Sequence, residues 1–148
     1  MTKTRPTVIP AVYMLFKKDD SFLLLRRFNT GYCDGQYSLP AGHLDGGETI
    51  IEAVIREATE ETGVSVKPED MTLYHVMNRY RANDGERVDF FFLTEKWEGE
   101  PCIMEKDKCD ELKWCHIDEL NDVGLIPYVK EMFENMKNGI MYSDTELN

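Results

Sequence analysis

The sequence lacks the features of a disulfide-stabilised or membrane-spanning protein. It has 4 cysteines, at positions 33, 102, 109 and 115, and none of them forms a C-x-x-C pair. A chain of 148 residues does not need disulfides to fold, so we expect reduced thiols and a cytoplasmic location. No apolar run approaches the roughly 20 residues that cross a bilayer, and we expect neither a signal peptide nor a membrane partner.

Positive charge is also scarce. Lys and Arg number 17 against 28 Asp and Glu, which gives a formal net charge of -11. A nucleic-acid polymer would meet a repulsive field on such a protein, so we do not expect one as a partner. A small phosphorylated substrate is still compatible with this balance, because a bound divalent cation inverts the local charge.

The composition that is present is that of a folded globular chain, with 42% hydrophobic and 11% aromatic residues. Period-two and short apolar runs predict strands over residues 7–18, 22–25, 37–39, 71–80, 87–96 and 111–117, and helical spacing predicts helices over 49–62 and 127–137. This order indicates an α+β fold with a mixed β-sheet between helices. We expect a single domain over residues 1–148, in which 138–148 form a flexible polar tail.

Three carboxylates lie on one face of the first predicted helix. Glu57, Glu60 and Glu61 stand at i, i+3 and i+4, a spacing that brings their Cβ atoms within about 5–6 Å. A solvated acidic face is one interpretation. A metal site is the other, because a glycine-rich loop leads into the helix and Mg²⁺ prefers oxygen ligands, waters and substrate phosphates.

The wider pattern decides between these interpretations. Residues 42–64 follow the Nudix box, G-x5-E-x7-R-E-U-x-E-E-x-G-U, in which U is a bulky aliphatic residue; its fixed positions are Gly42, Glu48, Arg56, Glu57, Glu60, Glu61 and Gly63. The one departure is the small Ala58. The chain therefore resembles the Nudix hydrolase family. Arg27, the segment 97–101 and Glu105 extend the resemblance to the MutT-like branch.

This resemblance implies a Nudix-type α/β/α sandwich and hydrolysis of a nucleoside diphosphate linked to another group. The implied ligands of Mg²⁺, or of Mn²⁺, are the Ala41 backbone carbonyl and the side chains of Glu57, Glu60, Glu61 and Glu105. One of the three helix glutamates would also act as general base, and Glu57 is our choice. Arg27 and His43 would contact substrate phosphates. Glu48 and Arg56 are expected to pair and hold the loop, with Gly42 and Gly63 as structural positions.

The substrate is less well defined. The MutT-like branch favours a small nucleotide, a (deoxy)nucleoside triphosphate converted to monophosphate and pyrophosphate. Dinucleoside polyphosphates and nucleotide sugars are alternatives, and a non-catalytic nucleotide-binding module is disfavoured because every metal-binding glutamate is kept. The stretch 125–129 has the proline of the family's base-reading segment but not its aspartate, tryptophan or asparagine, so no base is indicated. A homodimer, paired through a strand edge or through residues 13–16, is compatible with the sequence.

Overall fold

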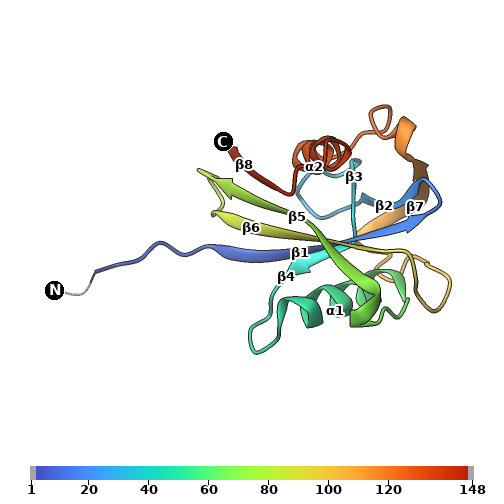
Figure 1. Ribbon diagram of the computed structural model, residues 1–148, viewed down its shortest axis with the longest axis horizontal. Helices are drawn as coiled ribbons and strands as arrows, with labels where there is room; N and C mark the ends of the chain where they lie inside the picture. Colours follow the sequence, from blue (N-terminus) through green and yellow to red (C-terminus); the bar gives the residue numbers. More distant parts are fainter. Residues whose placement is uncertain (1–2, 147–148) are drawn as a thin grey trace.

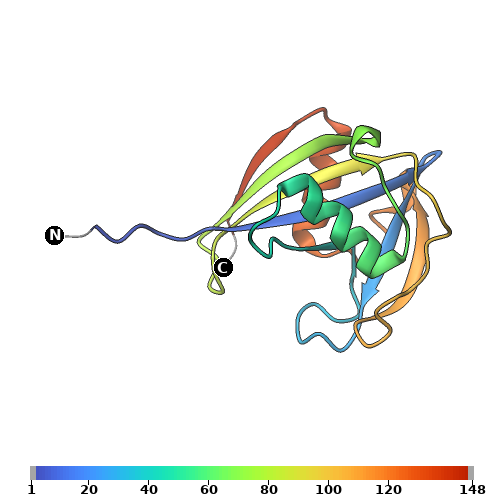
Figure 2. The same ribbon diagram turned by 90° about the horizontal axis from the view of Figure 1, so that it is seen from below.

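The computed structural model describes residues 3–146, and its strands form a mixed sheet that lies between two helices (Figure 1). In chain order the elements are β1 (Ile9–Lys18), β2 (Ser21–Arg27), β3 (Tyr37–Ser38), β4 (Ala41–His43), α1 (Ile50–Thr62), β5 (Met71–Tyr80), β6 (Arg87–Thr94), β7 (Cys109–His116), α2 (Pro127–Lys137) and β8 (Tyr142–Glu146). Figure 2 shows α1 in front of the sheet and α2 behind it. The predicted α/β/α sandwich is thus confirmed. None of the helices described is both long and apolar enough to cross a membrane.

The central strand of the sheet is β1. The strand order is β3-β2-β1-β6-β5-β8, with β4 also paired to β1 and β7 to β2. β1 runs parallel to β6 and antiparallel to β2 and β4. Val12, Met14 and Phe16 pack in the core under α1, whereas Tyr13 and Leu15 pack in the core under α2. Residues 13–16 are therefore interior and do not offer the pairing edge considered from the sequence.

Helix α1 has clear start and stop signals. The Thr49 hydroxyl accepts from the Glu52 N–H at 3.0 Å, and the Glu52 carboxylate accepts from the Thr49 N–H in return, which forms a capping box. Ala53, Val54 and Ala58 face the core. Gly63 ends the helix in the left-handed conformation with φ 76°, which favours glycine.

Removing the cap should weaken the helix without touching the acidic cluster. We expect Thr49→Ala to lower the free energy of unfolding by about 1 kcal/mol, the usual value of an N-cap side chain. In a domain of this size that corresponds to about 3 °C in melting temperature. Thr49→Ser, which keeps the hydroxyl, is the control. Equal melting temperatures for the alanine and serine variants in thermal denaturation would contradict the assignment.

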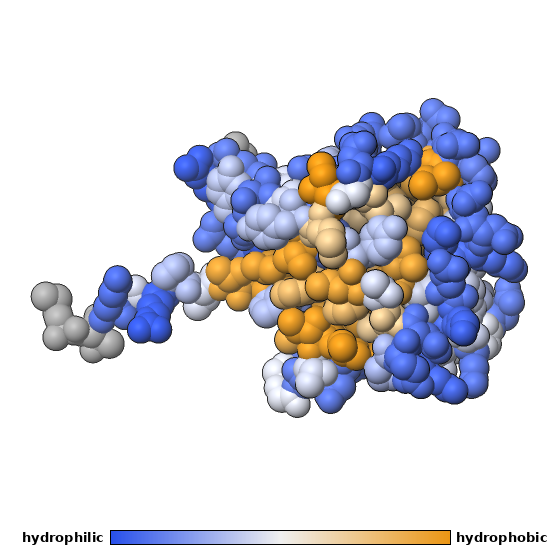
Figure 3. Space-filling model, viewed as in Figure 1, coloured by the Kyte–Doolittle hydropathy of each residue, from blue (hydrophilic) through white to orange (hydrophobic). Residues whose placement is uncertain are grey.

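Helix α1 covers only part of its side of the sheet, where it packs on β1 and β4. In the view of Figure 3, apolar side chains gather around the β1, β5 and β6 region. The exposed large apolar residues of the chain include Ile51 on α1 and Leu73 and Tyr74 on β5. The helix is thus placed over the strand, β4, that carries the glycine-rich loop.

Two strands were not predicted. Residues 142–146, part of the expected flexible tail, form β8 and pair in parallel with β5; residues 147 and 148 of that tail lie outside the described part of the chain. The buried His75 holds this segment, since its Nδ1 donates to the Ile140 carbonyl at 2.9 Å and its Nε2 lies 2.8 Å from Ser143 Oγ. The other strand is β4, which pairs with β1 through backbone hydrogen bonds. Its three residues show no alternation of apolar and polar side chains that would have predicted a strand.

Candidate active site

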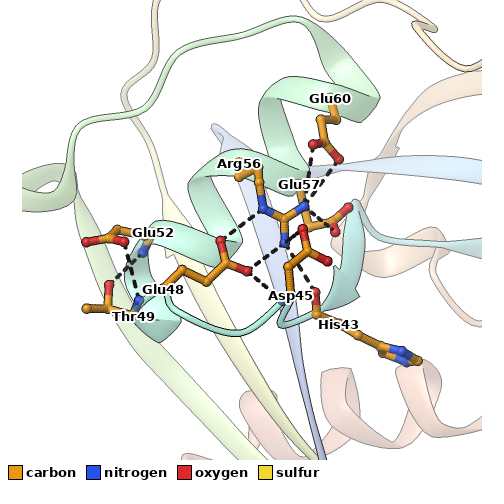
Figure 4. Close-up of polar contacts among 8 residues, drawn as sticks. All are labelled: His43, Asp45, Glu48, Thr49, Glu52, Arg56, Glu57 and Glu60. Carbon is orange, nitrogen blue, oxygen red and sulfur yellow. Dashed lines mark hydrogen bonds and ion pairs between the residues drawn. The ribbon is translucent and has the colours of Figure 1, made fainter.

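Arg56 on α1 lies at the centre of a group of carboxylates (Figure 4). Its Nε and Nη2 donate to the two oxygens of Glu48 at 3.0 and 2.8 Å, which is the predicted pair. This guanidinium lowers the pKa of the Glu48 carboxyl to about 2, with help from the Asp45 N–H. Nη2 also donates to the His43 carbonyl at 3.2 Å, so the arginine ties the loop before α1 to the helix.

The same guanidinium reaches two of the predicted metal ligands. Its Nη1 donates to Glu57 Oε1 at 2.9 Å and to the Glu60 carboxylate at 3.3 Å. Glu57 is largely buried, with 14% of its side chain exposed, whereas Glu60 is 53% exposed. Burial raises the pKa of Glu57 above its ordinary value, against the effect of Arg56. The sequence did not single out Asp45, which completes the group with an ion pair to Arg56 at 3.4 Å.

Gly42 is required by the position of the Glu57 carboxylate. A Cβ atom built on Gly42 would lie 2.1 Å from Glu57 Cδ and 2.2 Å from Glu57 Oε1. No side chain fits at such distances, so the carboxylate packs directly on the glycine backbone. The glycine at this point of the motif therefore serves close approach, whereas Gly63 serves the end of the helix.

Glu61 faces the loop from the next turn of the helix. Its Oε2 accepts from the Ala41 N–H at 2.9 Å. The pKa of Glu61 is raised to about 8. Burial is the main cause, the charges of Glu57 and Glu105 add to it, and the hydrogen bond from the Ala41 N–H opposes it. The carboxylates of Glu57 and Glu61 repel each other and are poorly solvated, so a cation bound between them would stabilise both.

The donor set suits a hard cation. The side chains are carboxylates, which are oxygen ligands that Mg²⁺ accepts, and β4 contacts them through the Ala41 N–H bond to Glu61. No three His, Cys, Asp or Glu side chains within residues 3–146 are already gathered around one point. Arg56 donates to Glu57 through Oε1 and to both oxygens of Glu60, and it leaves Glu57 Oε2 free to face a cation.

Ionisation of Glu61 should make the metal-free protein less stable as the pH rises. Its pKa is 4.5 in a model peptide and about 8 in the folded chain, so the folded state binds more protons than the unfolded state between these values. Stability is then lost as the pH rises from about 4.5 to 8. Glu61→Gln cannot ionise and should show a smaller loss. Thermal denaturation in EDTA at pH 5 to 8 tests this, and equal slopes for both proteins would contradict it.

A cavity of about 430 Å³ opens next to Glu61. Arg27, Glu61, Glu105 and Lys108 are among the residues that line it. Arg27 donates from Nε to the Tyr32 carbonyl at 2.6 Å and from Nη2 to Thr30 Oγ1 at 3.0 Å. Glu105 is 3.6 Å from the Lys108 ammonium group. The structure thus brings predicted phosphate-binding and metal-binding residues to one cavity.

A second cavity of about 640 Å³ shares Arg27 and Ser38 with the first and extends past Ala41, Gly42 and His43. Burial is the main cause that lowers the pKa of His43, with nearby Arg87 and Arg79 adding to it. The other walls of this cavity were missed from the sequence: Tyr13, Tyr32, Arg79, Asp84, Arg87 and Tyr128 are among them. They come from separate strands, a loop and α2, so no local spacing indicated them.

Comparison with known proteins agrees with this geometry. The model of the NUDIX domain family matches residues 6–136. The chain therefore belongs to the NUDIX family, whose members are pyrophosphohydrolases.

Individual relatives support the same assignment. The chain is 31% identical over 91 residues to the 8-oxo-dGTP diphosphatase of Escherichia coli K12, covering 62% of this chain and 68% of that protein. It is 41% identical over 69 residues to an ADP-ribose pyrophosphatase of Methanocaldococcus jannaschii, of which it spans 40%. Its fold is similar to the MutT NUDIX hydrolase of Burkholderia pseudomallei, with a TM-score of 0.78, 27% identity and coverage of 86% and 97% of the two chains.

Proposed function

We propose that this protein is a metal-dependent nucleoside triphosphate pyrophosphohydrolase. Its products would be a nucleoside monophosphate and pyrophosphate. The observation that carries the proposal is the partly buried pair Glu57 and Glu61, beside two cavities that share Arg27. Glu61 lines the first cavity, and the Glu57 carboxyl group packs on Gly42, which lines the second. An elongated substrate fits this arrangement, with its phosphates beside the carboxylates and its nucleoside in the second cavity.

The proposed cation is Mg²⁺, with Mn²⁺ as an alternative. Glu57, Glu60, Glu61 and the Ala41 carbonyl would hold it, with Glu105 as a further ligand from the wall of the first cavity. When bound, the metal neutralises phosphate oxygens and lowers the pKa of the attacking water.

The protein side chains supply the remaining functions. Glu57 would accept the proton of the attacking water, a role that its raised pKa favours because a base works best near the operating pH. Arg27 and His43 face the cavities and would donate to substrate phosphate oxygens. Arg56 and Glu48 would fix the loop that carries Ala41 and Gly42.

The test is a product assay across NTPs, dNTPs, ADP-ribose and dinucleoside polyphosphates. Pyrophosphate and orthophosphate are measured separately, with Mg²⁺ and then with excess EDTA. We expect pyrophosphate release from a few triphosphates that EDTA abolishes. Turnover of dinucleoside polyphosphates or ADP-ribose alone would assign a different nucleotide substrate. Nucleotide binding without turnover would replace the proposal with a non-catalytic binding module.

A further inference from the structure

A buried ion pair forms one wall of the second cavity. Arg79 on β5 is 5% exposed, and Asp89 on β6 is fully buried. The arginine donates from Nε to Asp89 Oδ2 at 2.5 Å and from Nη2 to Asp89 Oδ1 at 3.1 Å. This two-point pairing fixes the plane of the guanidinium, because both bonds must be satisfied together.

Two tyrosines fix the same guanidinium from other elements. The Tyr13 hydroxyl on β1 accepts from Arg79 Nη2 at 3.3 Å and donates to the Tyr128 hydroxyl at 3.2 Å. The Arg79 Cζ lies 4.0 Å from the centre of the Tyr128 ring on α2, a stacked cation–π contact. Arg79 is thus held rigidly by strand, strand and helix.

One end of Arg79 is left available. The bonds described use Nε and Nη2, and Nη1 has no hydrogen-bond partner within residues 3–146. In that part of the chain the buried side-chain atoms without partners are Gln36 Oε1 and Asn135 Nδ2, so Nη1 is accessible, and Arg79 lines the second cavity. A rigid donor with two N–H groups therefore borders the cavity and is accessible to an acceptor on a ligand.

The chemistry of the cavity indicates what supplies that acceptor. Asp89 already balances the charge of Arg79. A substrate phosphate is therefore attracted less strongly to Arg79 than to Arg27, which lines the same cavity. Three tyrosines line the cavity. Tyr13 stacks on Phe91 and Arg79 covers the ring of Tyr128, whereas Tyr32 is exposed and suits contact with a planar ring. An arginine N–H donates a hydrogen bond to the keto oxygen of a base. It cannot do so to an exocyclic amino group, because the arginine N–H and the amino group are both donors.

We propose that Arg79 is a specificity-determining residue that donates from Nη1 to a keto oxygen of the substrate base, with Asp89 as its positioning residue. The inference rests on the proposed function, because it takes the cavity beyond Arg27 as the nucleoside end of the site. The enzyme would then prefer nucleotides whose base carries an oxo group, such as the 6-oxopurines, over nucleotides of 6-aminopurines.

Inosine and adenosine triphosphates are the matched probes, since they differ at position 6 of the purine. We expect kcat/KM with Mg²⁺ to favour inosine triphosphate by at least about tenfold in the wild type. Arg79→Lys keeps a charge for Asp89 but loses the fixed fork, and should reduce this preference below about threefold. Arg81→Lys is the control, because Arg81 is an exposed arginine on the neighbouring hairpin loop.

Asp89→Asn provides a second variant that retains Arg79. It should also reduce the preference while pyrophosphate release continues, because Arg79 is then less firmly oriented. Circular dichroism and thermal denaturation establish that each variant is folded. Equal kcat/KM for the two nucleotides in the wild type, or an unchanged preference in both variants, would overturn the proposal.

Binding separates this inference from the proposed function. Calorimetric titration with inosine and adenosine monophosphates needs no turnover. If no triphosphate is hydrolysed but inosine monophosphate binds at least about tenfold more tightly, and Arg79→Lys removes that difference, the assignment of Arg79 stands and the proposed reaction fails. If triphosphates are hydrolysed but inosine and adenosine nucleotides show equal affinities and equal kcat/KM, the proposed reaction stands and the assignment of Arg79 fails.

Discussion

Glu61→Gln is expected to fold normally and to hydrolyse its substrate at least about 100-fold more slowly than the wild type. The amide keeps an oxygen that accepts from the Ala41 N–H, so the loop stays in place. It loses the negative charge that the proposed metal requires. Initial rates of pyrophosphate release at saturating Mg²⁺ measure the effect.

The control for this variant is Glu69→Gln, which makes the same chemical change at an exposed residue of the turn before β5. It should retain wild-type activity. In metal-free buffer near pH 8, Glu61→Gln should melt at a higher temperature than the wild type, because the ionised carboxylate is destabilised by burial. Near-wild-type turnover by Glu61→Gln would remove Glu61 from the proposed metal site.

Gly42→Ala should produce a comparable loss through geometry alone. The added methyl group would overlap the Glu57 carboxyl group, with its Cβ 2.1 Å from Cδ, so the carboxylate must leave its position. A displacement of about 1 Å in a catalytic group costs about 100-fold in rate. We therefore expect a fall of about this size in kcat/KM with secondary structure retained, measured by the same assay and by circular dichroism.

Gly124→Ala is the matched control for this substitution. A Cβ atom at Gly124 meets nothing within 4 Å, so the same added methyl group should leave activity unchanged. An equal, small effect of both substitutions on kcat/KM would show that the contact between Gly42 and Glu57 does not matter for the reaction.

The part of the site that lies on one continuous segment was predictable. Helix α1, its glycine end and the pairing of Glu48 with Arg56 depend on spacings within a few turns of chain, and the structure confirms them. Helix α2 has the predicted bounds for the same reason. The glycine-rich loop before α1 was recognised from the sequence, but the strand β4 at its start pairs with β1, which is about 30 residues away.

The second cavity was not predictable in this way. Arg79 is followed by Tyr80 and Arg81 at the polar end of the hairpin, and nothing local marks it as buried. Its partners Asp89, Tyr13 and Tyr128 come from two other strands and a helix, so only the tertiary fold brings them together. The same holds for β8, whose polar residues are held by backbone bonds to β5 and by His75.

The parallel pairing of β1 with β6 has a consequence for synthesis of the chain. Ile9 pairs with Arg87, 78 residues later, so β1 leaves the ribosome long before its partner exists. At roughly 5–20 residues per second this delay lasts about 4–16 s. The apolar segment from Val12 to Phe16 is wholly buried in the finished protein, and its edge toward β6 stays without its partner strand for that time. The β1–β6 pairing, and with it the sheet, therefore forms only after β6 has emerged, so folding is completed late in synthesis or after it.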